Sequence, residues 1–240
     1  MSYYDDYYPP YTSVGEQRAK ADKLIARLRK KNPELEPVIL QGRAMASNWW
    51  GKAWNTNLES YADYANRISR GKSYVRNHAV VDLKIEQGLV EALVMGSSSK
   101  PYQVQVAIDK LASNRWEKIV ELCNHRIDSM EKLLAGKFPR ELEELFREEA
   151  YGLFPSLREI HFDCTCPDYA SMCKHVAAVL YGVGARLDHN PLLFFTLRGV
   201  NVKELLKRSA QSRMDSMLKN AGKITRRVLS EEETHDLFGL

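Results

Sequence analysis

The sequence predicts an α+β protein, in which a three-stranded antiparallel meander is packed by helices and followed by a small strand–helix unit. Apolar and polar residues alternate in three runs between residues 79 and 108, which is typical of strands with one buried face. Apolar residues recur every three or four positions from Ser47 and again from about Asn114, which is typical of amphipathic helices. A cluster of cysteines and a histidine within residues 164–175 indicates the strand–helix unit.

Composition divides the chain into four predicted segments. Residues 1–45 hold a flexible, tyrosine-rich arm and a short charged helix; the arm is expected to be loose rather than docked on a partner. Residues 46–157 form the α+β domain, and residues 158–200 form the strand–helix unit packed on it. Residues 201–240 form a basic helical tail with an acidic end.

Three tryptophans open the helix predicted after Ser47, within NWWGKAWNTNLE. Trp50, Trp54 and Leu58 follow one another at helical spacing, and Ser47 or Asn48 is the expected N-cap. The tryptophans suit either a stacking platform for bases or anchors in the core. Helical spacing favours core anchors.

The three alternating runs are HAVVDLKIE, LVEALVMG and YQVQVAID, joined by a Gln87-Gly88 turn and by SSSKP. Short connections of this kind predict an antiparallel meander. Beyond it, one apolar stripe over residues 114–135 predicts helix, and an acidic helix follows at roughly 140–150. Cys123 lies on the stripe, so it is expected to be a buried core thiol and not a metal ligand.

The overall charge of the chain says little about its partners. A formal charge of +4 and a pI near 8.8 are only mildly basic, too weak by themselves to imply nucleic acid. The N-terminus lacks a positive segment followed by an apolar run, and no stretch of about 18 apolar residues occurs. We therefore expect a cytoplasmic protein without membrane association, whose thiols stay reduced.

The chemistry-bearing motif has the spacing C-x-C-x6-C-x-H, on a predicted strand, a loop and the start of a helix. Structural zinc prefers four thiolate or imidazole ligands in a tetrahedron. Pro167 stiffens the turn after the first pair, and a helix N-terminus favours thiolate in the second pair. We expect a structural zinc ion bound by Cys164, Cys166, Cys173 and His175.

A catalytic zinc is a weaker interpretation of the same residues, because catalytic sites keep an open position and a base. Neither H-x-E with P-C-x-x-C nor H-E-x-x-H occurs, and no glycine-rich phosphate loop is present. Asp163 and Asp168 flank the ligands, but a supporting or surface role is favoured. His161 is an alternative ligand, but as a strand residue it is expected to point away from the metal. The sequence therefore predicts a protein that is not an enzyme.

The string CTCPDYASMCKHVAAVLY closely resembles the SWIM zinc-finger family, whose prokaryotic members typically read C-S-C-P-D-W and then C-K-H-I-A-A-V. NWWGKAWNTNLE, RGKSYVR, KFPRELEELF and HNPLLFFTLRG also have counterparts, so the resemblance covers roughly residues 46–200. Tyr169 replaces the usual tryptophan, and Met172 stands where proline often precedes the third cysteine. The resemblance implies a finger that binds nucleic acid or protein. Its prokaryotic members are often linked to Swi/Snf-type helicases, which implies an accessory subunit of a DNA-processing assembly.

Two basic regions bear on nucleic-acid binding. Residues 67–78 carry no acid and are expected to form a loop because of Gly71 and Ser73. Clustered cations would bind phosphates, Gly71 would allow close approach and a tyrosine would stack on a base. The predicted DNA contacts are Arg67, Arg70, Lys72, Tyr74 and Arg76, with Lys174 beside the zinc ligands.

A protein–protein adaptor without direct nucleic-acid contact is the alternative function. The basic tail, over residues 203–227, also carries apolar residues at helical spacing, including Met214, Met217 and Leu218. Such a helix suits docking on a partner subunit as well as it suits phosphate binding. Composition alone leaves both functions open.

Overall fold

The computed structural model describes residues 13–62, 65–124, 143, 147–148, 152–168, 170–201, 207, 211, 214–215 and 217–220. The tyrosine-rich arm, the stripe beyond residue 124, most of the acidic helix and most of the tail lie outside the described residues, as does the side chain of Cys123. Those predictions stay predictions.

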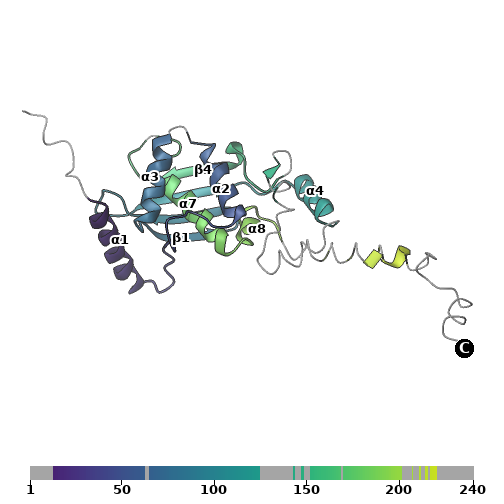
Figure 1. Cartoon of the computed structure of the whole chain (residues 1–240), viewed down its shortest axis with the longest axis horizontal. Helices are drawn as coiled ribbons and strands as arrows, with labels where there is room; N and C mark the ends of the chain where they lie inside the picture. The colour runs from purple at the N-terminus through teal and green to yellow at the C-terminus, as the bar shows by residue number, and fades with distance from the viewer. Residues whose placement is uncertain are drawn as a thin grey trace, which may run out of the picture.

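A four-stranded antiparallel sheet forms one layer of the molecule, in the order β1-β2-β3-β4. Its strands are β1 (Val80–Glu86), β2 (Leu89–Val94), β3 (Tyr102–Ile108) and β4 (Ile160–Cys164). The predicted three-stranded meander is therefore short by one strand. The strand that delivers the first cysteine pairs with β3, where Val104 faces Cys164 and Ile108 faces Ile160. Figure 1 shows β1 and β4 at opposite edges of the sheet.

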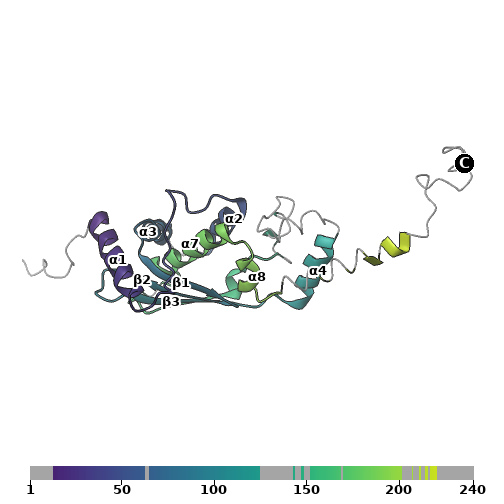
Figure 2. The ribbon, with the colours of Figure 1, turned by 90° about the horizontal axis from the view of Figure 1, so that it is seen from below.

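Helices cover one face of the sheet (Figure 2). They are α2 (Trp49–Glu59), α3 (Ala65–Arg76), α7 (Lys174–His189) and the short α8 (Leu193–Leu197). Twelve of the sixteen residues of α7 are buried, so this helix is apolar nearly all round and forms the centre of the core. The strand and helix that carry the zinc ligands therefore share one hydrophobic core with β1–β3.

The tryptophans of α2 anchor that helix on α7, which confirms the core interpretation. Trp50 and Trp54 are buried, and each indole N–H donates to a backbone carbonyl of α7 at 2.9 Å, of Leu187 and of Leu180. These bonds satisfy the polar atom of each buried ring. Asn48 is the N-cap of α2, as expected.

Residues 67–78 are not the predicted loop, because most of them belong to α3. The glycine that indicated a loop is used for packing. A Cβ on Gly71 would lie 2.6 Å from Ala177 Cβ and 3.1 Å from the Ala178 nitrogen. Glycine is present because the backbone of α3 lies directly against α7, and not because the chain turns.

We expect Gly71→Ala to destabilise the protein by about 1–3 kcal/mol, because overpacking would push α3 away from α7. Chemical denaturation of the zinc-loaded protein measures this change. Gly15→Ala in α1 (Val14–Arg29) is a matched control, since nothing lies within 4 Å of a Cβ there. An equally stable Gly71→Ala variant would show that the helices are not in close contact.

The N-terminal helix α1 packs through a narrow apolar stripe formed by Ala21, Leu24 and Ile25. Leu24 and Ile25 lie with Val81 and Met95 in a small cluster separate from the main core. Val81 reaches this cluster because β1 has an irregular register between Val80 and Asp82. The expected alternation through Val81 therefore breaks at a bulge.

A buried arginine ties the segment after α8 to the start of β4. Arg198 is 1% exposed and donates to Glu159 Oε1 at 2.6 Å and to the Asp109 carbonyl at 2.9 Å. Arg115, from α4 (Ser113–Asn124), donates to the same Glu159 oxygen at 3.0 Å. The Glu159 carboxylate thus pairs with two guanidinium groups, where α4, the segment before β4 and the segment after α8 meet.

Within the described residues, no helix has the length and apolar character needed to cross a membrane.

Candidate metal centre

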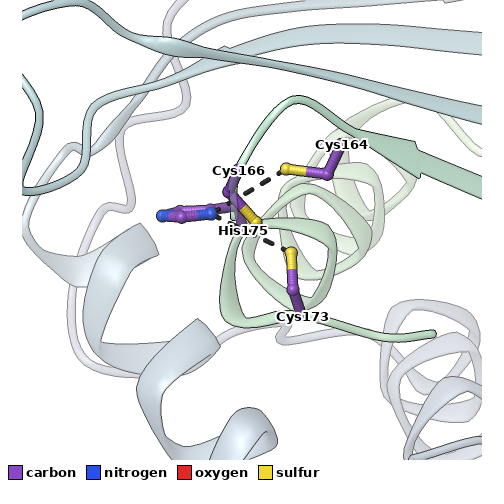
Figure 3. A group of neighbouring side chains, drawn as sticks. All are labelled: Cys164, Cys166, Cys173 and His175. Carbon is purple, nitrogen blue, oxygen red and sulfur yellow. Dashed lines mark hydrogen bonds between the residues drawn. The ribbon is translucent and has the colours of Figure 1, made fainter. Parts of the chain in front are cut away.

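Four side chains converge between the end of β4 and the start of α7 (Figure 3). Cys164 is the last residue of β4, Cys166 lies in the loop that follows, Cys173 is the N-cap of α7, and His175 lies in its first turn. Their ligand atoms all lie within 4.8 Å of one another. The sequence analysis predicted these four residues as a zinc site.

The local backbone directs the cysteine side chains toward one point. Pairing with β3 continues one residue beyond Cys164, since the Thr165 N–H donates to the Gln103 carbonyl at 3.0 Å. The chain turns only after this bond, which brings Cys166 back toward Cys164. Cys173 has extended backbone, and its sulfur accepts the Val176 N–H at 3.5 Å. A cysteine here takes the place that serine or aspartate usually has at an N-cap.

The separations match tetrahedral zinc. His175 Nδ1 lies 3.9 Å from the sulfurs of both Cys164 and Cys173. Zinc–sulfur bonds of about 2.3 Å and zinc–nitrogen bonds of about 2.1 Å place such ligand atoms roughly 3.6 Å apart in a tetrahedron. Small movements would bring all four atoms into range. The centre binds zinc with three thiolates and one imidazole, in a closed, structural donor set.

Two tyrosines hold the ligating imidazole in place. The rings of Tyr102 and Tyr74 lie with their centroids 4.5 Å and 5.3 Å from that of His175. His175 Nε2 is buried and has no hydrogen-bond partner in the described part of the chain. A Cβ on Gly96 would lie 3.0 Å from that nitrogen. Nδ1 is therefore the metal-binding nitrogen, and aromatic packing takes the orienting role that a hydrogen bond to the second nitrogen usually has.

Without metal the three thiols do not ionise alike. The pKa of Cys173 is lowered to about 4, because its sulfur accepts hydrogen bonds from the Cys164 thiol, from His175 and from the Val176 N–H. The pKa of Cys164 is raised by donating that bond and by burial, and burial also raises the pKa of Cys166. Zinc must displace the remaining protons, so its binding releases protons.

Three of the six predicted DNA contacts have partners within the protein. Arg67 forms an ion pair at 3.1 Å with Asp168, in the zinc loop. Lys72 forms one at 2.9 Å with Glu59 of α2, and it also lies over the Tyr181 ring. Tyr74 contacts His175, as described above, and burial raises its pKa.

The other three predicted contacts lie at the surface. Arg70 and Arg76 are exposed on α3, and Lys174 is half-buried in the first turn of α7. Arg76 Nε donates to the Arg43 carbonyl at 3.3 Å. In the described part of the chain, no carboxylate forms an ion pair with any of these three cations. The cations that do form ion pairs there are Arg67, Lys72, His78, Arg115, Lys118, Arg147, His161, Arg186 and Arg198.

The acids and the histidine beside the motif lie where the sequence suggested. Asp168 supports α3 through Arg67, and Asp163 is exposed on the sheet face opposite the helices. His161 shares that face and pairs with Asp109 at 3.2 Å, so it points away from the metal. The sequence did not indicate that Tyr102 packs against the ligand His175, because its position at the start of a strand predicts only a strand residue.

Comparison with known families agrees with the donor set. Residues 161–183 match the family model of the SWIM zinc finger. The chain therefore carries a SWIM zinc finger, and the matched segment contains all four predicted ligands.

A relative of this chain is the uncharacterized protein Rv2102 of Mycobacterium tuberculosis, which is 35% identical over 173 residues. The similarity covers 72% of this chain and 62% of the relative, so the chain spans about three fifths of that protein's length. No solved structure matches significantly.

Proposed function

We propose that this protein is a non-catalytic, zinc-binding accessory subunit that binds DNA through the solvent face of α3. The observation that carries the proposal is a polar helix face without acids. Its exposed polar residues are Asn66, Ser69, Arg70 and Arg76, and Ala65 is exposed at its first position. Arginine, serine and asparagine are side chains that commonly contact phosphate oxygens.

The surface cations support this choice of face. Arg70 and Arg76 are about 1.7 helical turns apart on α3, and Lys174 begins the neighbouring helix α7. Because no carboxylate pairs with these groups among the described residues, binding to phosphates would not have to break an ion pair. Each neutralised phosphate would release counterions and make the affinity salt-dependent.

The zinc ion would serve this function by fixing α3. The ion pair between Arg67 and Asp168 joins α3 to the zinc loop, and Tyr74 of α3 lies against the ligand His175. Metal binding thus stabilises the helix that presents the cations. This role needs no open coordination position, in keeping with a protein that is not an enzyme.

The proposed DNA contacts predict a steep salt dependence. We expect the plot of log affinity against log salt to lose about 0.9 in slope for each phosphate contact removed, so Arg70→Ala with Arg76→Ala lowers the slope by about 2. Fluorescence anisotropy with duplex DNA measures it. The matched control is Arg18→Ala with Arg27→Ala, two exposed arginines of α1. Absence of binding at low salt, or an unchanged slope in the α3 variant, would refute this function.

A protein–protein adaptor is the second candidate, favoured by the C-terminal segment. Met214, Met217 and Leu218 are 54–74% exposed, which suits a helix that docks on a partner. The family resemblance makes a subunit of a Swi/Snf-type helicase assembly the proposed partner. Failure of the DNA experiment would favour this adaptor function.

A further inference from the structure

We propose that the free edge of β1 binds an extended segment of a partner protein, which adds to the sheet as a fifth strand and carries a basic side chain. This site is separate from the proposed DNA-binding face and does not depend on it. The zinc centre lies at the end of β4, at the other edge of the sheet. Three strand spacings, about 14 Å, separate the two edges.

The main chain of β1 offers unpaired groups at this edge. Residues along a strand point their N–H and C=O groups alternately to one side and the other. The Leu83 N–H points away from β2, since it donates to the Glu36 carbonyl at 3.0 Å. Ile85, two residues further, turns its N–H and C=O the same way. No hydrogen bond from the described part of the chain reaches these two groups.

The same edge already accepts a strand-like segment of this chain. The Val38 N–H donates to the Val80 carbonyl at 3.0 Å, and the Glu36 carbonyl accepts from Leu83. These two bonds place residues 36–38 antiparallel to β1. Toward its N-terminus that segment diverges from β1, so pairing stops before Ile85. A partner segment would continue the interrupted ladder, as in β-strand addition.

A groove of about 660 Å³ opens where the two segments diverge. Residues 33–36 form one wall and residues 83–86 form the other, and Leu193 and Arg186 close the side nearest the helices. This volume is within the range of ligand-binding clefts. Ile85 and Leu193 are partly exposed and contribute apolar surface, which suits the apolar side chains of an extended peptide, whereas Leu35 and Leu83 lie buried beneath them.

Charge favours a basic residue in the partner. Glu34 and Glu86 line the groove, are exposed and have no ion-pair partner among the described residues. Two cations also line the groove, Arg186 and Lys84, against three glutamates, Glu34, Glu36 and Glu86. Arg186 donates to the Glu36 and Pro37 carbonyls, at 2.9 Å and 3.3 Å. Lys84 stands opposite Glu91 in the neighbouring strand.

A displayed library of random heptapeptides, selected on the full-length zinc-loaded protein, tests this proposal. We expect enrichment of sequences that alternate apolar residues with lysine or arginine. A synthetic consensus peptide should bind at least tenfold more weakly to Ile85→Pro, which lacks the edge N–H. Ile85→Ala keeps that N–H and should retain binding, so this pair separates the main-chain bond from the side chain. Proline is tolerated at edges where the N–H faces outward.

A second pair of variants keeps the test valid if Ile85→Pro does not fold. Glu86→Lys should weaken the consensus peptide several-fold, whereas Glu91→Lys, exposed on the next strand and outside the groove, should not. Failure to enrich any sequence, or equal binding by Glu86→Lys and Glu91→Lys, would overturn the proposal. Concentration-dependent self-association lost in Glu86→Lys would also overturn it, in favour of a second copy of this chain at the edge.

Discussion

Replacing Cys166 with serine is expected to abolish binding of one zinc ion and to lower the stability of the whole protein by more than about 3 kcal/mol, since structural zinc contributes about 10–16 kcal/mol in small zinc-finger peptides. Cys166 suits this experiment because it lies in the loop after β4, is only partly buried and does not cap α7. The loss would therefore report on the metal. Chelation of zinc from the native protein should have the same effect.

The destabilisation should spread beyond the finger. β4 is part of the four-stranded sheet, and α7 forms the centre of the helix layer, so the zinc ion joins two elements of one core. We expect a single unfolding transition at a lower temperature, and not the separate melting of residues 158–187. Calorimetry together with zinc quantification by mass spectrometry measures both quantities.

A control variant separates metal loss from damage to β4. His161→Ala removes a neighbouring imidazole that is 60% exposed and points away from the cluster. This variant should keep one zinc ion and nearly all of its stability. If Cys166→Ser retained stoichiometric zinc, or if the chelated protein melted at the same temperature, the structural role of the metal would be wrong.

Local patterns predicted most of the sheet and the zinc ligands from sequence. Alternation identified β1, β2 and β3, and the cysteine spacing identified the cluster, because in both cases the interacting residues are close in sequence. The pairing of β4 with β3 joins residues more than 50 positions apart. No periodicity within a five-residue strand specifies such a partner, so this pairing was missed.

The error at α3 has a different physical origin. Glycine is common both in turns and where two backbones come into contact, and Gly71 belongs to the second kind. Only the neighbouring Ala177 and Ala178 show which applies. Arg67, Lys72 and Tyr74, predicted to contact DNA, also have partners within the protein that the sequence does not reveal. A charge pattern shows which side chains are cationic, but not which of them already have a partner.

The burial of Arg198 and its ion pair with Glu159 could not be predicted from the sequence either. Loss of this ion pair is expected to have a large effect on stability. We expect Glu159→Ala to destabilise the protein by about 3–5 kcal/mol, because removal of one member of a buried ion pair leaves the other charge uncompensated. Arg198 is 1% exposed, and Arg115 shares the same carboxylate oxygen. Chemical denaturation at neutral pH measures the change. Glu121→Ala, in an exposed pair with Lys118, should cost less than about 1 kcal/mol.

Acid should reduce the difference between wild type and Glu159→Ala. Burial opposes ionisation of Glu159, but hydrogen bonds from Arg198 and from Ser156 outweigh it and lower its pKa from 4.5 to about 2. A lowered folded-state pKa means that the stabilisation is complete above pH 4.5 and is lost as the pH falls toward 2. Because acid also releases zinc from both proteins, the quantity to follow is the difference in their unfolding free energies. A difference that stays constant below pH 4.5 would show that the charge of Glu159 is not what stabilises Arg198.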